Sequence, residues 1–157
     1  MIRIACLLVV APVLLVSVVS SAPPKPNFTG TWKVNLQKSK LQIPPPESTL
    51  FVVEHEEPNL RLTRTHVFQG KSDTFTIQLA TDGKEVVHKD DKRTIYSRAY
   101  WEGSVLAFDS RILVDGGEAT NVVRYQMAKD GQSFTARERL RSPQRNYDNV
   151  WVMERQK

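Results

Sequence analysis

The histidines and the acidic pairs are the side chains of this sequence most able to do chemistry, and their spacing argues against catalysis. His55, His66 and His88 lack the close partners, with a third carboxylate or thiol, that a zinc site requires. The pairs Glu56-Glu57 and Asp90-Asp91 lie in turn-like segments, where carboxylates face solvent. No nucleophile elbow, His-Glu-x-x-His motif, phosphate loop or dinucleotide-binding glycine pattern occurs. We therefore expect no enzyme, no metal and no cofactor, although a single axial histidine would be enough to hold a haem.

A second group of polar side chains shares alternating stripes with apolar residues, as expected for side chains that line a cavity. Arg64 and His66 continue the stripe of Leu60 and Leu62. If the stripe that holds Trp32 faces inward, Arg64 and His66 meet the polar group of a ligand. If the register is shifted by one residue, both face solvent instead. On the inward interpretation, the lining residues are Phe28, Leu62, Arg64, His66, Phe75, Ile77, Leu79, Ser97, Ala99, Phe134 and Met153, with Arg111 as a further polar candidate.

The elements that must position these side chains are β-strands, because a period of two recurs along the chain. Residues 27–35 open the series, with Phe28, Gly30, Trp32 and Val34 at every second position. Further strands are expected at residues 50–53, 60–68, 74–79, 86–88, 95–101, 105–113, 122–127, 134–140 and 150–155.

Turn signals separate these strands at regular intervals. Asp82-Gly83, Glu102-Gly103 and Asp130-Gly131 are typical hairpin turns. Three successive prolines at residues 44–46 exclude both a helix and a central strand at that point. Sequential hairpins without long crossovers favour an all-β, antiparallel up-and-down barrel of about 8–10 strands, which leaves no exposed sheet edge. A sandwich of two sheets is the alternative.

The first 22 residues have the pattern of a signal peptide. Arg3 precedes an almost wholly apolar run that ends at Ser20-Ser21-Ala22, where small residues suit a signal peptidase. We predict cleavage after Ala22 and a protein that is exported, periplasmic or extracellular, without a stable membrane anchor. Cleavage removes Cys6, the single cysteine of the chain. A proline-rich spacer at residues 23–26 then leads into one barrel domain at residues 27–155.

The charge of the chain is moderately basic, with 22 lysines and arginines against 17 acidic residues. Most of the basic residues are scattered, and one denser patch contains Arg137, Arg139, Arg141 and Arg145. A nucleic-acid-binding protein usually shows a basic stripe interleaved with stacking aromatics. We therefore expect no nucleic acid among the partners.

The opening strand resembles those of the calycin barrels, the lipocalins and fatty-acid-binding proteins. The resemblance rests on Phe28-x-Gly30-x-Trp32, on Gly30-Thr31-Trp32-Lys33-Val34, which is similar to the opening of fatty-acid-binding proteins, and on the hairpin Trp101-Glu102-Gly103. As a pattern it extends over most of residues 27–155, and the whole chain is most similar to lipocalin-like proteins that bacteria export.

The resemblance implies that Gly30 and Trp32 close the bottom of the barrel. In lipocalins the corresponding tryptophan packs under a late-strand arginine, for which Arg139 and Arg155 are the candidates. The chain departs from fatty-acid-binding proteins in two respects. The proline-bearing segment replaces their two lid helices, so we expect no helical lid. The last strand lacks their Arg-x-Tyr pair, which puts carboxylate binding in doubt.

Two functions from different classes follow from these features. The first is an exported barrel that binds a small hydrophobic or amphipathic molecule in its interior. The second is a non-catalytic structural or protein-interaction barrel with a core filled by side chains, acting through an outer surface such as the arginine patch.

Overall fold

The computed structural model describes residues 24–114 and 117–157, and their regular structure is entirely β-strand. This confirms the predicted all-β class. The signal peptide predicted at residues 1–22 lies outside the described residues, as does Pro23 of the spacer. The ten strands are β1 (Gly30–Val34), β2 (Ser48–Glu56), β3 (Asn59–Phe68), β4 (Lys71–Ala80), β5 (Val86–Lys89), β6 (Arg93–Glu102), β7 (Val105–Val114), β8 (Gly117–Met127), β9 (Ser133–Arg141) and β10 (Asn146–Arg155).

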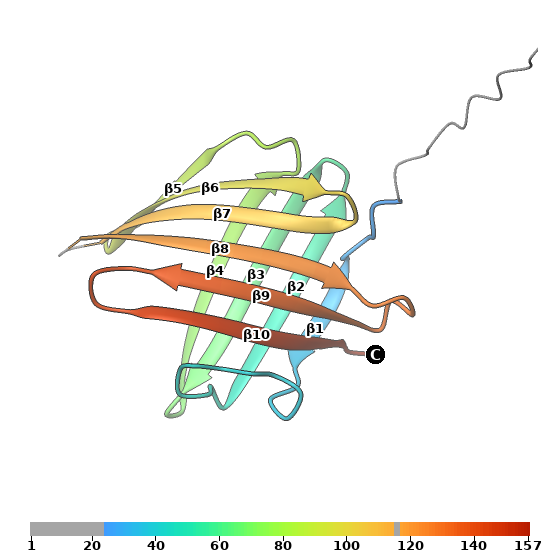
Figure 1. The fold of residues 1–157 in the computed structure, drawn as a ribbon, viewed down its shortest axis with the longest axis horizontal. Helices are drawn as coiled ribbons and strands as arrows, with labels where there is room; N and C mark the ends of the chain where they lie inside the picture. Colours follow the sequence, from blue (N-terminus) through green and yellow to red (C-terminus); the bar gives the residue numbers. More distant parts are fainter. Residues whose placement is uncertain (1–23, 115–116) are drawn as a thin grey trace, which may run out of the picture.

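The strands form one antiparallel sheet in the order β4-β3-β2-β1-β10-β9-β8-β7-β6-β5. In Figure 1, strands β6 to β10 cross in front of β1 to β4 at a steep angle, so that the sheet encloses an interior. The two edges, β4 and β5, are not paired with each other. Beside them the Gly83 amide donates to the Ala99 carbonyl at 2.9 Å, and the Phe75 and His88 rings lie 5.1 Å apart. The result is the predicted up-and-down barrel, nearly closed, rather than a sandwich.

The register determines which stripe of each strand faces the interior. Trp32 is opposite Phe51, Phe51 is opposite Arg64, and Arg64 is opposite Phe75. Trp32 and Phe51 are buried, and neighbours on β2 alternate strictly between buried and exposed. The stripe that carries Arg64 therefore faces inward, because opposite residues in paired strands share one face.

One end of the interior, the closed half, is densely packed. Phe28, Trp32, Phe134 and Met153 are all fully buried there. The Phe134 ring meets Phe28 at 5.4 Å and Trp32 at 4.9 Å, both edge to face. Phe28 precedes β1 instead of belonging to it, so the strand expected at residues 27–35 begins later. The Trp32 indole N–H donates to the Phe28 carbonyl at 2.9 Å, which holds this turn of chain over the end of the barrel.

Arg155 seals the closed half from the last strand. Its guanidinium carbon lies 4.1 Å from the centre of the Trp32 ring, and it donates to the carbonyls of Thr29 (2.7 Å) and Gly131 (3.1 Å). Gly30 has a φ of 143°, and a side chain there would collide with the Arg155 guanidinium. Of the two arginines considered for this contact, Arg155 makes it. Arg139 points outward and pairs with Asp148 at 3.3 Å, because odd-numbered residues of β9 face solvent.

The segment between β1 and β2 contains no helix, as expected from its prolines, and runs along β10 instead. Ser39 Oγ accepts from the Val152 amide at 3.0 Å, and Gln42 Oε1 accepts from the Asp148 amide at 2.8 Å. Lys40 forms a β-bridge with Val150. Side-chain oxygens thus satisfy backbone donors of β10 beyond the end of the short strand β1.

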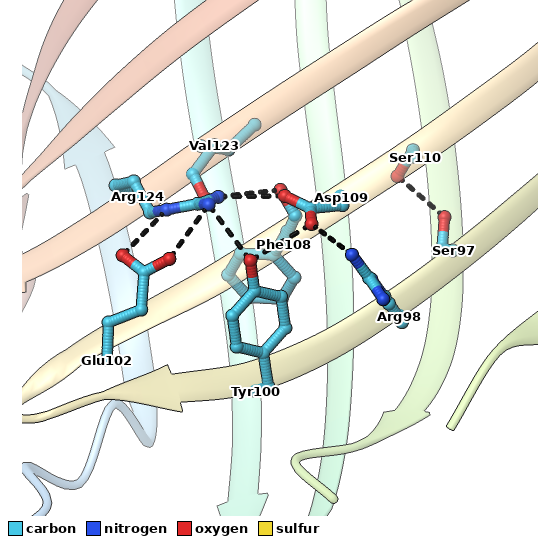
Figure 2. A network of polar contacts seen from close by, with 9 residues as sticks. All are labelled: Ser97, Arg98, Tyr100, Glu102, Phe108, Asp109, Ser110, Val123 and Arg124. Atoms are coloured by element: carbon cyan, nitrogen blue, oxygen red, sulfur yellow. Dashed lines mark hydrogen bonds and ion pairs between the residues drawn. The ribbon is translucent and has the colours of Figure 1, made fainter. Parts of the chain in front are cut away.

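On the outer face, five polar side chains hold β6, β7 and β8 together (Figure 2). Arg124 donates to Asp109 (2.9 Å), Glu102 (3.0 Å) and the Tyr100 hydroxyl (3.0 Å). Tyr100 in turn donates to Asp109 at 3.0 Å, as does Arg98 at 2.9 Å. Although partial burial raises the pKa of Asp109, the bonds from Arg124 and Arg98 outweigh it and lower that pKa. We call this set the outer network.

Within residues 24–114 and 117–157, no helix has the length and apolar character needed to span a membrane.

Candidate functional site

The half of the interior opposite the closed half contains side chains that are less completely buried than those of the closed half. Its inward-facing side chains keep part of their surface exposed, in contrast to the fully buried residues of the closed half. They include Leu62 on β3, Phe75 on β4, Val123 on β8, Leu140 on β9 and Tyr147 on β10. Since these side chains point toward the barrel axis, their partial exposure indicates that this end is packed less tightly.

The same part of the interior carries polar side chains that include Arg64, His66, Asn121 and Glu138, and we call it the polar half. Strand β3 positions Arg64 and His66, whereas β8 and β9 position Asn121 and Glu138. Glu138 is opposite Val123, and Asn121 is opposite Leu140, which places both on the inward stripe.

Glu138 is anchored by three donors. Trp151 Nε1 donates to Oε2 at 2.8 Å, Asn149 Nδ2 donates to the same oxygen at 3.1 Å, and Asn121 Nδ2 donates to Oε1 at 3.3 Å. Two carboxylate oxygens offer about four acceptor positions. Most of the hydrogen-bonding capacity of Glu138 is therefore used within the protein.

Asn121 has a fixed orientation and a free acceptor. Its amide nitrogen donates to Glu138, and turning the amide over would place its oxygen against the carboxylate. The Oδ1 atom is buried and has no hydrogen-bond partner among the described residues. Native proteins seldom leave such an atom unpaired, and the described residues supply no donor for it.

Arg64 presents the complementary feature. Its Nε atom is buried without a partner in the described part of the chain. Its Nη2 atom lies 3.4 Å from Asp73 Oδ2, and the side chain of Asp73 is 65% exposed. Such a long contact with a solvated carboxylate neutralises Arg64 only weakly. The guanidinium lies 5.9 Å from the centre of the Phe75 ring.

His66 is held as a neutral ring. Burial and, next, the positive charge of Arg64 lower the pKa of His66 to about 4, and Asp73 opposes them. Thr49 Oγ1 lies 2.7 Å from His66 Nδ1, and the indole of Trp151 stacks on the imidazole with centroids 5.9 Å apart. At neutral pH His66 thus offers a polar ring without a charge.

The charges of the polar half act on two inward-facing tyrosines. Burial raises the pKa of Tyr147 to about 12, with Glu138 as the next cause, while Arg64 opposes it. Burial and then Glu138 also raise the pKa of Tyr125, and Arg64 again opposes them. Both charges act on both rings, and the register places Arg64 on β3 and Glu138 on β9 on the same inner face of the barrel.

The predicted lining residues are distributed over both halves. Phe28, Ala99, Phe134 and Met153 are fully or almost fully buried in the core, and Ile77 and Leu79 are also part of it. Leu62, Arg64, His66 and Phe75 lie in the polar half. Ser97 is buried and shares a hydrogen bond of 2.7 Å with Ser110. Arg111, also considered inward, faces outward and stacks on Tyr96 at 4.2 Å.

Sequence reasoning missed Asn121 and Glu138. A signal for Glu138 was present, because it alternates with Phe134, Ala136 and Leu140 and so belongs to an apolar stripe. Asn121 carried no comparable signal, since strand β8 begins five residues before the predicted 122–127.

His55 belongs to the closed half. The Phe28 amide donates to His55 Nδ1 at 3.2 Å, so Nε2 carries the proton that faces Glu57 Oε1 at 2.9 Å. Burial of Glu57 raises its pKa, but bonds from His55, Thr81 and Trp101 lower it to about 2. These contacts fasten the N-terminal segment to the barrel.

Among the described residues, no three metal-ligating side chains form a cluster.

An open groove of about 560 Å³ lies on the surface at the end of β2, β3 and β4 that belongs to the closed half, beside His55, Leu60 and Leu79. Its charged residues, Glu54, Glu56 and Arg61, carry mixed signs, and Glu54 and Arg61 pair with each other at 3.2 Å. This groove therefore lacks the converging unpaired groups that distinguish the polar half.

The sequence matches no protein-family profile and no curated protein. Solved structures do match. Secretory abundant heat soluble protein 4 from Ramazzottius varieornatus has a TM-score of 0.59 at 15% identity, over 88% of this chain and 100% of that one. A Schistosoma mansoni fatty acid binding protein in complex with arachidonic acid has 0.52 at 13%, over 83% and 96%. The zebrafish ileal bile acid-binding protein complexed with cholic acid has 0.53 at 11%, over 82% and 98%.

At such low identity the likeness concerns the fold alone. It agrees with the antiparallel meander of hairpins described above. The chain has the fold of the calycin β-barrels.

Proposed function

We propose that this protein binds a small hydrophobic or amphipathic molecule inside its barrel. The observation that carries the proposal is the polar half, where apolar side chains facing the axis stay partly exposed and Arg64 Nε and Asn121 Oδ1 lack partners. Ligand sites are typically apolar with a few polar groups that orient the guest. Two barrels of similar fold, the complexes with arachidonic acid and with cholic acid, support binding of this type.

Export is part of the proposal and rests on residues 1–22. An exported binding protein would sequester or carry its ligand outside the cytoplasm. Expression of the full chain in a bacterial host, followed by fractionation and intact-mass measurement, tests this point. We expect a product that starts at Pro23 outside the cytoplasm, and an uncleaved cytoplasmic product would contradict it.

The binding test compares two adjacent valines on β8. Val123 faces the interior and Val122 faces outward, and both are partly exposed. Purified protein is titrated with Nile red, an uncharged apolar dye. We expect saturable uptake, a loss of affinity of about tenfold or more with Val123→Trp, and little change with Val122→Trp. Thermal unfolding of both variants checks that the fold is retained.

The alternative function is a filled barrel that acts through its outer surface. It predicts no uptake of Nile red by the unmodified protein. In a filled barrel Val123→Trp would overpack the core, so it would lower stability more than Val122→Trp without changing any binding of the dye. The unpaired interior atoms favour ligand binding over this alternative, because a core filled for stability alone would pair them.

A further inference from the structure

The polar half offers one unpaired donor and one unpaired acceptor, and they come from strands on opposite sides of the barrel. Arg64 Nε projects from β3, and Asn121 Oδ1 projects from β8. A ligand that satisfies both must itself carry an acceptor and a donor. A carboxylate has acceptors only, an ester has an acceptor only, and a primary amide has both.

The charges around these two atoms match this donor and acceptor: a negative charge lies beside Asn121 and a positive charge beside β3. Glu138 lies next to Asn121, with 3.3 Å between Asn121 Nδ2 and Glu138 Oε1. At Tyr125 the effect of Glu138 exceeds the opposing effect of Arg64, so the negative charge dominates at that ring. At His66 the effect of Arg64 exceeds that of Asp73, so the potential beside β3 is positive. An anion that reached Asn121 would be repelled by the charge of Glu138. An uncharged polar group can place its acceptor near Arg64 and its donor near Asn121.

Building on the proposed function, we propose that the polar half selects an uncharged amphiphile whose polar group both donates and accepts hydrogen bonds, best matched by a carboxamide. The amide oxygen accepts from Arg64, and the amide N–H donates to Asn121 Oδ1. Glu138 acts as a positioning residue, because it fixes the orientation of Asn121 and disfavours an anionic group. The hydrocarbon part of the ligand packs against Leu62, Phe75 and Val123.

The test uses three probes with the same chain: hexadecanamide, hexadecanoate and methyl hexadecanoate. Each displaces Nile red from the full protein, purified under delipidating conditions. We expect hexadecanamide to bind about tenfold more tightly than the other two, which corresponds to one well-made hydrogen bond in a buried site. This ranking needs no variant and is therefore independent of any folding defect.

Two substitutions then assign the roles. Asn121→Leu should lower the affinity for hexadecanamide by about tenfold and leave the affinity for methyl hexadecanoate unchanged. Glu138→Gln should raise the affinity for hexadecanoate relative to that for hexadecanamide. If Glu138 were only structural, the substitution would not change this ratio. The matched controls are Thr120→Leu on the outer side of β8 and Arg137→Met on the outer side of β9, and both should keep the wild-type ranking.

Two failures are distinguishable. If hexadecanoate binds as tightly as hexadecanamide or more tightly, or if Asn121→Leu weakens all three probes equally, the inferred selectivity is wrong and the proposed binding function stands. If the unmodified protein takes up no Nile red and none of the probes binds, the proposed function itself is wrong.

Discussion

The closed half and the polar half occupy the same barrel, yet they treat polar atoms in opposite ways. In the closed half, the Trp32 indole N–H and the Arg155 guanidinium have partners within 3.1 Å. In the polar half, Arg64 Nε and Asn121 Oδ1 are buried and unpaired. The comparison indicates that the closed half stabilises the fold and the polar half serves binding, because unpaired buried groups lower stability and are retained where function needs them.

The largest expected difference concerns two inward residues of one strand, β9. Phe134→Ala should lower the free energy of unfolding by about 3–5 kcal/mol, because it leaves a cavity among Phe28, Trp32 and Tyr125. Leu140→Ala, in the partly exposed polar half, should cost less than about 2 kcal/mol. Urea unfolding of both variants measures the difference. Equal losses would mean that the two halves are packed alike.

The two inward arginines sharpen the comparison. Arg155→Met should cost about 2 kcal/mol, since it removes the contact with Trp32 and two hydrogen bonds to carbonyls. Arg64→Met should change the free energy of unfolding by less than about 1 kcal/mol, because the substitution removes an unpaired buried donor. Denaturant unfolding at neutral pH tests both. A large loss with Arg64→Met would show that Arg64 is structural.

The dependence of stability on pH provides a third test. The pKa of folded His66 is about 4, against 6.5 for an ordinary histidine, so the unfolded chain binds more protons between these values. The contribution of His66 is therefore complete above pH 6.5 and is lost as the pH falls toward 4. His66→Phe should reduce the change of the thermal unfolding midpoint with pH between pH 4 and 6.5. An unchanged slope would contradict the assignment.

The smallest expected effect lies outside the barrel, in the outer network. Tyr100→Phe removes one hydroxyl that donates to Asp109 and accepts from Arg124, both of which keep other partners. We expect a loss of about 1 kcal/mol in thermal or urea unfolding and no change in the binding of Nile red. A change in dye affinity would link this outer face to the interior.

Much of the fold could be predicted from the sequence, because alternation along each strand reports burial directly. The inward stripe of β3, with Leu62, Arg64 and His66, followed from choosing the Trp32 stripe as inward. The role of Phe28 could not be predicted. It continues the same alternation as Trp32, but its position over the end of the barrel depends on His55 and Trp32.

The candidate site was predictable only in part. Arg64 and His66 stand out as polar residues on an apolar stripe, whereas Asn121 lies in a polar stretch with no alternation of its own. Its importance comes from the contact with Glu138 and from the oxygen left unpaired, and both depend on the pairing of β8 with β9. The contacts of Ser39 and Gln42 with β10 were equally hidden, since the partners are more than a hundred residues away.

The pairing of β1 with β10 also determines how this protein can be handled. Trp32 lies opposite Arg155, and the Gln156 amide donates to the Thr31 carbonyl at 2.8 Å, so the chain ends at the closed half. In Figure 1 the C-terminus lies at the right, away from the loop that joins β9 to β10. A biosensor surface or a fluorescent fusion attached through Lys157 would therefore leave the other end of the barrel, at the polar half, facing the sample.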